Sequence, residues 1–181
     1  MPSVLAWPRR LPDTLDGLYA AVSSRLPAEL GLEEVDDLSA ESPAAADRGA
    51  AVIVVDDNPE TLAAVAAILH ADAVDVVLVV GDAFLGSDAQ DLRPSQTGGA
   101  AVAAVRSKAT RRGATHRANV VCIAGSLVGA PSSQRGPLAH SPAMTDVADA
   151  VAFLVDADNA YLNGQVLFVN GGRHLFSSMS S

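Results

Sequence analysis

Five short runs of apolar residues recur along the chain, and each run is continuous instead of alternating with polar residues. A continuous apolar run of this length is typical of a β-strand that is covered on both faces, as in a parallel sheet. The five runs cover residues 3–7, 51–55, 76–80, 119–123 and 165–169.

Segments of helical composition separate these apolar runs. Buried strands that alternate with helices predict an α/β fold, namely a three-layer α/β/α Rossmann-like domain with a mostly parallel sheet of about six strands. Asn58 precedes Pro59 and is expected to cap one helix, and Thr145 followed by Asp146 marks the start of another. The expected helices cover residues 12–26, 59–71, 99–112 and 145–155.

Length and composition fit one domain, residues 1–181, because an apolar fraction of 49% supports one continuous core. The single cysteine, Cys122, lies inside an apolar run and is expected to be a buried thiol outside any disulfide. No stretch reaches the roughly 18 apolar residues of a membrane span, and the N-terminus lacks the apolar core of a signal peptide. We therefore expect a soluble protein in the reducing cytoplasm.

Charge is distributed unevenly along the chain. The net charge of −9 argues against nucleic acid as a partner. Between Leu92 and Thr145 there is no acidic residue, so this segment carries +7 and the remainder −16. We expect the two to be matched across the folded domain, and the alternative is a docking face for an acidic partner. The seven cations are Arg93, Arg106, Lys108, Arg111, Arg112, Arg117 and Arg135.

The second half of the chain carries a longer sequence pattern. Residues 145–154 read TDVADAVAFL, and residues 160–172 read AYLNGQVLFVNGG. Upstream, residues 98–102 read GGAAV and residues 117–121 read RANVV. These segments resemble the short-chain dehydrogenase/reductase family, close to its 3-oxoacyl-carrier-protein reductase branch. They match the helix after the active-site tyrosine, the strand that follows it, the final helix, the last strand and the terminal Gly-Gly.

The resemblance divides the domain into unequal parts. Residues 75–172 are the better-preserved half, residues 1–74 are an eroded N-terminal half, and residues 173–181 form a tail. The chain is also shorter than members of the family, and most of the shortfall lies before residue 75. The resemblance therefore implies the family's fold in a truncated form.

The resemblance also implies that the family's catalytic residues are lost. In the family a tyrosine protonates the substrate carbonyl, a lysine four residues later lowers the pKa of that tyrosine, and a serine thirteen residues earlier orients the carbonyl. The matched register places Ser95 at the tyrosine, Gly99 at the lysine and Asp82 at the serine. We therefore expect no catalytic residue at these degenerate positions.

A count of residue types supports this expectation without any alignment. The chain has two tyrosines, Tyr19 and Tyr161, and one lysine, Lys108. Four residues after the tyrosines come Ser23 and Gln165, so the chain contains no Tyr-x-x-x-Lys pair. Proton donation in the manner of the family has no agent here, because it needs a phenol whose pKa a neighbouring cation lowers.

The turn after the first strand lacks the features of a dinucleotide site. Such a site needs glycines that let the backbone approach a pyrophosphate above a helix N-terminus. Residues 7–17 read WPRRLPDTLDG, with one glycine and with two prolines that remove backbone donors. We expect no cofactor on this chain, and NADPH only on a partner subunit.

Other patterns favour different chemistry less strongly. Residues 54–60 read VVDDNPE, which is similar to the acidic strand end of a receiver domain, but no aspartate follows at the required distance, and helix capping explains the pattern. A repurposed enzyme would use Asp82, Ser95 or a histidine such as His116 or His140. The histidines show no ligand spacing with carboxylates or Cys122, so we expect no metal site.

Two expected helices are rich in alanine, at residues 61–69 and 100–105. Small residues let helices approach closely, and in the family the corresponding helices build a four-helix dimer interface. The alternative is that they cover the sheet of a monomer.

We therefore expect a non-catalytic subunit that associates with a complete ketoreductase of the same family, through these helices and its C-terminal strand. The alanine-rich, lysine-poor composition indicates a high-GC bacterium. The resemblance implies a polyketide or fatty-acid-type pathway there, with acyl carrier protein as a further partner. Two alternatives stay open. One is a cyclase, dehydratase or hydrolase, and the other is a homodimeric scaffold or ligand sensor.

Overall fold

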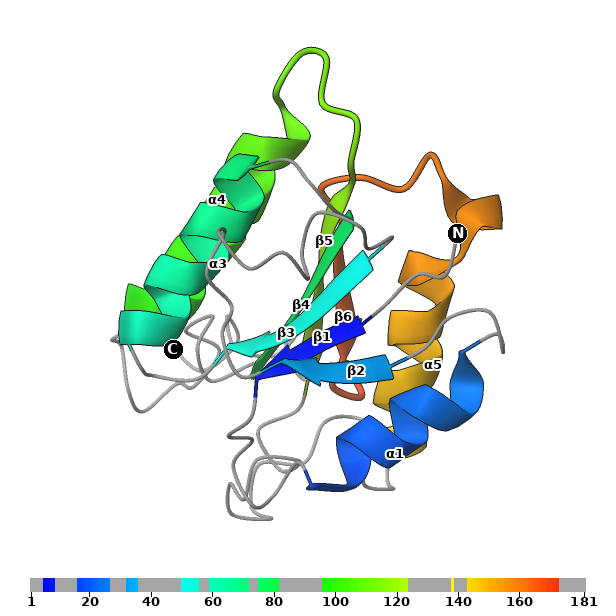
Figure 1. Ribbon diagram of the computed structural model, residues 1–181. Coiled ribbons are helices and arrows are strands. Elements are labelled where there is room, and N and C mark those ends of the chain that lie inside the picture. Colours follow the sequence, from blue (N-terminus) through cyan, green and yellow to red (C-terminus); the bar gives the residue numbers. More distant parts are fainter. Residues whose placement is uncertain are drawn as a thin grey trace, which may run out of the picture.

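The computed structural model describes residues 5–8, 16–26, 32–35, 50–55, 59–71, 75–81, 96–123, 138 and 143–172. Within these residues the chain forms a β-sheet layer between two layers of helices (Figure 1). The strands are β1 (Leu5–Pro8), β2 (Leu32–Val35), β3 (Ala50–Val55), β4 (Asp75–Gly81), β5 (Ala118–Ile123) and β6 (Val166–Val169). The helices are α1 (Asp16–Arg25), α3 (Pro59–Ala71), α4 (Gln96–Ala109), α5 (Met144–Val155) and the short 3-10 helix η4 (Ala157–Asn159).

All described strand pairs are parallel. Strands β3, β4, β5 and β6 are hydrogen-bonded in that order, and β1 pairs with β2. Strand β1 also lies beside β3, which brings the two groups of strands together (Figure 1). The prediction of an α/β/α sandwich with about six strands is confirmed.

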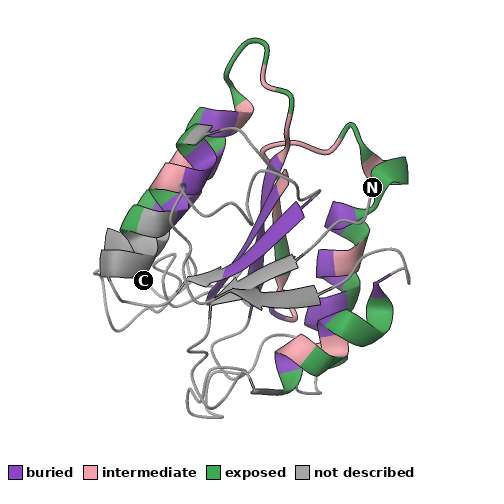
Figure 2. Cartoon of the chain, viewed as in Figure 1, coloured by how far each residue is buried: buried purple, intermediate pink, exposed green. Residues whose placement is uncertain are grey.

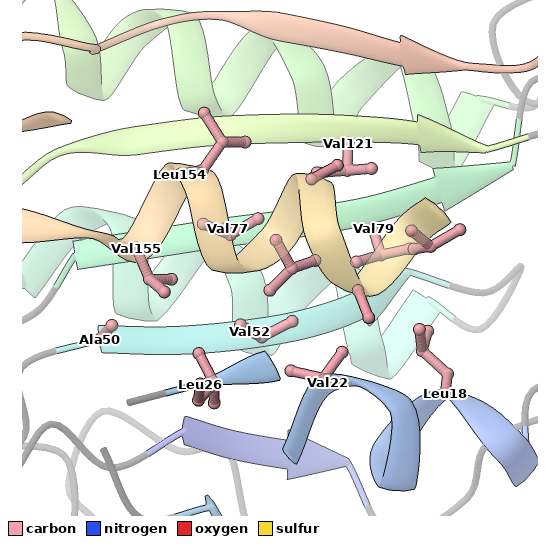
Figure 3. Close-up of a cluster of buried hydrophobic side chains, with 14 of the residues drawn as sticks. Leu18, Val22, Leu26, Ala50, Val52, Val77, Val79, Val121, Leu154 and Val155 are labelled. Atoms are coloured by element: carbon pink, nitrogen blue, oxygen red, sulfur yellow. The ribbon is translucent and has the colours of Figure 1, made fainter. Parts of the chain in front are cut away.

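Each face of the sheet is covered by one pair of helices, because successive side chains of a strand point to opposite faces. In β4, Val77 and Val79 belong to the core under α1 and α5, whereas Val76 and Leu78 belong to the core under α3 and α4. Figure 3 shows the first of these cores, where Leu18 and other apolar side chains of α1 meet the sheet. The continuous apolar runs of the sequence thus serve both cores.

The helix ends differ from their predicted positions. The prediction for α3 is confirmed at both ends, but α4 runs from residue 96 to 109 instead of 99 to 112. Helix α5 begins at Met144, not Thr145, because the N-cap is Ala143, whose N–H donates to the Asp146 carboxylate at 2.7 Å. Helix α1 begins at Asp16, and residues 12–15 and Asn58 lie outside the described residues.

Candidate functional site

Ligands of parallel α/β sheets bind at the carboxyl ends of the strands, so the degenerate catalytic positions are considered first at that end. Asp82 follows the last residue of β4 and Ser95 precedes the first residue of α4, and both lie outside the described residues. Gly99 lies in the first turn of α4 and is exposed. A Cβ added there would meet no heavy atom within 4 Å, so the position has room for a side chain but carries none.

The only lysine lies far from this position. Lys108 is fully buried in the last turn of α4, nine residues after Gly99. At 1.5 Å per residue this spacing carries it about 13 Å along the helix, toward the amino ends of the strands. The helix therefore places its single ammonium group at the opposite end from Gly99.

Neither tyrosine belongs to α4, the helix that carries Gly99 and Lys108. Tyr19 belongs to α1, on the other face of the sheet from α4, and packs partly buried against the α1/α5 core. Tyr161 is fully exposed between η4 and the start of β6, at the amino end of the strands.

The amino ends of the strands are joined by an arginine that sequence reasoning did not single out. The Arg117 guanidinium pairs with the Asp75 carboxylate at 2.7 Å and donates to the Asn159 carbonyl at 2.9 Å and more weakly, at 3.4 Å, to the Val155 carbonyl. Arg117 thereby caps the C-terminal end of α5, where orphan carbonyls need donors. The expected match of charge across the fold is confirmed for this pair.

Two asparagines complete the same end of the sheet. Asn119 donates to the Leu162 carbonyl at 3.0 Å and accepts from the Gln165 N–H at 3.0 Å. Asn163 donates to the Ala109 carbonyl at 3.2 Å, and it accepts from a backbone N–H of β5. Each amide is thus occupied by backbone partners, and the role of this network is structural.

The described histidines also contact neighbours at the amino end. The His70 ring nitrogen Nδ1 lies 3.2 Å from the Arg111 guanidinium, which also donates to the His70 carbonyl at 3.0 Å. His116 Nδ1 lies 2.9 Å from the Thr115 hydroxyl. His116 lies just before β5, at the amino end of the strands, and His140 lies outside the described residues.

Other predicted sites have mixed outcomes. Cys122 is a buried thiol outside any disulfide, as predicted. Among the residues that the structure describes, no group of three His, Cys, Asp or Glu side chains is arranged to hold a metal ion. Residues 9–15 and 56–58, which include the altered cofactor turn and the acidic strand end, lie outside the described residues. No described helix is both long and apolar enough to cross a membrane.

The terminal Gly-Gly of the sequence pattern has a structural reason. Gly171 and Gly172 follow β6 with φ of +62° and +81°, a region that side chains other than glycine rarely adopt. A Cβ on Gly171 would lie 3.5 Å from Leu138. The Gly-Gly pair thus turns the chain after the last strand.

Among the residues of α3 and α4 whose burial is described, several of the exposed ones are small; Figure 2 marks the exposed positions in green. The surface of these small residues, which we call the small-residue face, is defined by Ala63, Ala66, Gly99, Ala100 and Ala103, all of them exposed. At the edge of the sheet, β6 in addition exposes 36% of Leu167 and 38% of Phe168.

Comparison with known proteins relates this architecture to one group of enzymes. No protein-family model matches the chain, and no curated protein matches its sequence. Among solved structures, it is similar to a 3-alpha-hydroxysteroid dehydrogenase from Pseudomonas sp. B-0831 complexed with NADH, at 18% identity and a TM-score of 0.67. That alignment covers 99% of this chain and 100% of the other.

Two enoyl-acyl-carrier-protein reductases are also similar. The enzyme from Aquifex aeolicus VF5 aligns with a TM-score of 0.61 at 13% identity, over 96% of this chain and 98% of the other. The enzyme from Plasmodium berghei aligns with a TM-score of 0.58 at 12% identity, also over 96% and 98%. These likenesses in structure, at low identity, show that the chain has the fold of the short-chain dehydrogenase/reductases.

Proposed function

We propose that this chain is a non-catalytic subunit with the short-chain dehydrogenase/reductase fold that associates with a catalytically complete ketoreductase. The observation that carries the proposal is the position of Lys108, the only ammonium side chain, at the far end of α4 from Gly99. A general acid must reach the reacting group within hydrogen-bond distance. The chain holds no Tyr-x-x-x-Lys pair, and Gly99 stands at the position of the lysine in the matched register, so the family's proton relay lacks its members here.

The small-residue face supports the association. Exposed alanines and glycine on two adjacent helices let a partner helix approach closely, and burial of such a face gains free energy through packing over a broad area. The partner is a reductase subunit of the same fold, which brings its own NADPH. The edge strand β6, with Leu167 and Phe168, offers a second contact.

The resemblance of residues 75–172 to 3-oxoacyl-carrier-protein reductases adds a context to the proposal. The complete subunit would reduce a carrier-bound ketone in a bacterial polyketide or fatty-acid-type pathway, and acyl carrier protein would visit the complex. The present chain stabilises that subunit or shapes its pocket and performs no chemical step.

Titration of the purified chain with NADPH tests the absence of cofactor binding and catalysis. We expect no change in nucleotide fluorescence up to about 1 mM, since that limit corresponds to only about 4 kcal/mol of binding free energy. Oxidation of NADPH by the isolated chain with any ketone substrate would refute the proposal. A reductase of the same fold that is active alone is the positive control.

Light scattering after co-expression with reductases of the same host tests the association. We expect a complex with one of them, and we expect Ala103→Arg on the small-residue face to abolish it. The matched control is Ala157→Arg, the same change at an exposed position of η4, which should leave the complex intact. A stable homodimer that ignores every reductase would favour the scaffold alternative and contradict the proposal.

A further inference from the structure

Three exposed arginines lie at the C-terminal ends of α3 and α4. Arg106 is in the last turn of α4, and Arg111 and Arg112 are in the turn that follows. Arg111 also contacts His70 at the end of α3, which places the ends of the two helices side by side (Figure 1). We call the surface formed by these three arginines the basic end.

Cations at a helix C-terminus ordinarily compensate its unpaired carbonyls, so that role has to be examined first. The last carbonyls of α4 have other donors. The Thr110 hydroxyl donates to the carbonyls of Arg106 and Ser107, both at 3.1 Å. The Arg111 N–H donates to the Lys108 carbonyl at 3.0 Å, and the Asn163 amide donates to the carbonyl of the last helical residue, Ala109. The guanidinium groups of Arg106 and Arg112 are therefore not needed as caps.

Two other charged side chains at this end, Arg111 and Asp75, have partners among the described residues. The Arg111 guanidinium donates to the carbonyl of His70, and the nearby Asp75 carboxylate is taken by Arg117 at 2.7 Å. Within the described part of the chain, neither Arg106 nor Arg112 forms an ion pair. Among the described residues, the basic end is thus a concentration of positive charge in which Arg106 and Arg112 have no ion-pair partner.

We propose that the basic end binds a carboxylate-rich segment of another protein. A guanidinium binds a carboxylate through two parallel hydrogen bonds, which favours acidic side chains as ligands. The segment has to be short, because outside residues 92–145 the chain carries −16 and repels any polyanion that extends beyond the surface. This repulsion disfavours a nucleic acid, whose phosphate charge continues along its whole length. The proposal does not depend on the pairing through the small-residue face.

The test uses the full chain and a fluorescently labelled deca-glutamate peptide. In about 0.1 M salt the Debye length is about 10 Å, so each part of the peptide responds mainly to protein charges within about that distance of it. We expect fluorescence anisotropy to report binding that weakens at least tenfold in about 0.5 M salt, because exposed ion pairs are screened. In spectra of the ¹⁵N-labelled protein, the amides of residues 106–117 should shift and those of α1 and α5 should not.

Variants locate the binding. The double variant Arg106→Gln, Arg112→Gln should weaken the affinity about tenfold, because exposed charge pairs contribute modestly and roughly additively. Arg25→Gln, which removes an exposed arginine on the other face of the sheet, should leave the affinity unchanged. Equal spectra of circular dichroism for the variants establish that all are folded.

Several outcomes would overturn the proposal. These are an absence of binding up to about 1 mM peptide, an unchanged affinity of the double variant, or amide shifts centred away from residues 106–117. Binding of a ten-residue oligothymidylate as tightly as deca-glutamate would also overturn it, since the surface would then be a general polyanion site and not a docking site for acidic protein.

Discussion

The two helical layers bury similar side chains against the sheet but present different surfaces outward. On the α1/α5 layer, the exposed Arg25 and Asp149 form an ion pair at 2.8 Å, and Asp146 caps the start of α5. On the α3/α4 layer, most of the exposed positions that the structure describes are alanine or glycine. The α1/α5 surface also exposes Phe153, which lies between Asp149 one turn before it and Asp156 one turn after it.

This difference separates what folding requires from what association requires. A layer that only covers a sheet needs apolar residues on one side and polar residues on the other. The α1/α5 layer has apolar residues toward the sheet and polar residues outward. The α3/α4 layer also has apolar residues toward the sheet, but its small-residue face has alanine and glycine outward instead of polar residues. Small exposed residues gain little within a monomer and permit close approach of another helix, so the comparison favours α3/α4 as the associating layer.

The largest expected effects come from the two cores, and they test whether the layers are equally well packed. Leu69 in the α3/α4 core and Leu154 in the α1/α5 core are both 2% exposed. We expect Leu69→Ala and Leu154→Ala each to lower the free energy of unfolding by about 3 kcal/mol, through lost burial and a new cavity. Urea denaturation measures both values. A cost below about 1 kcal/mol for Leu69→Ala alone would mean that α3/α4 is not a packed layer.

The next largest loss of unfolding free energy is expected when the contacts of Arg117 between α5 and the amino end of the sheet are removed. Arg117→Met removes the guanidinium that pairs with Asp75 and caps α5. We expect a loss of about 2–3 kcal/mol, because the Asp75 carboxylate, only 20% exposed, keeps its charge without its partner. Thermal unfolding measures the effect. If the further change Asp75→Asn restored none of the lost stability, the unpaired carboxylate would not be the cause of the loss.

The corresponding link of α4 to the sheet is tested at a glycine. Gly164 has φ of +72°, and a Cβ there would lie 3.0 Å from the Ala109 side chain at the end of α4. We expect Gly164→Ala to cost about 2 kcal/mol, from backbone strain together with this contact.

Gly113→Ala is the matched control for that substitution, since Gly113 has φ of +79° and no neighbour within 4 Å of the added Cβ. It should cost about 1 kcal/mol, from strain alone. Equal melting temperatures of the two variants would show that a Cβ at Gly164 does not clash with the Ala109 side chain at the end of α4.

The smallest effect is expected at the surface of the α1/α5 layer. Arg25→Met removes an ion pair whose side chains are 45% and 60% exposed. We expect a change below about 0.5 kcal/mol, because solvent screens exposed pairs. A loss comparable to that of Arg117→Met, measured by the same denaturation, would contradict the distinction between a surface pair and a buried cap.

Much of the fold is predictable from local sequence, and the exceptions have identifiable causes. The bounds of α3 follow from Pro59 and the apolar pattern after it, and β3 to β6 follow from continuous apolar runs. Strand β2 reads LEEV and has no such run, so its pairing with β1 was not predicted. Helix α4 ends three residues early because Thr110 and Arg111 supply donors to its last carbonyls.

The candidate site was predictable only in part. The loss of the Tyr-x-x-x-Lys pair follows from counting two tyrosines and one lysine. The partners of Arg117 were not predictable, because Asp75 and Asn159 each lie 42 residues away and nothing local marks them. Exposure on the small-residue face likewise depends on which side of each helix meets the sheet.

The sequence by itself determined the class of fold and the absence of a Tyr-x-x-x-Lys pair, because apolar periodicity and residue identity are local properties of a chain. Only the tertiary structure decided that Lys108 is buried at the C-terminal end of α4, that Arg117 binds carbonyls at the end of α5 and in η4, and that Arg106 and Arg112 form no ion pair with another described residue. Those facts depend on which distant segments meet, and contacts between segments far apart in the chain are set by packing of the whole.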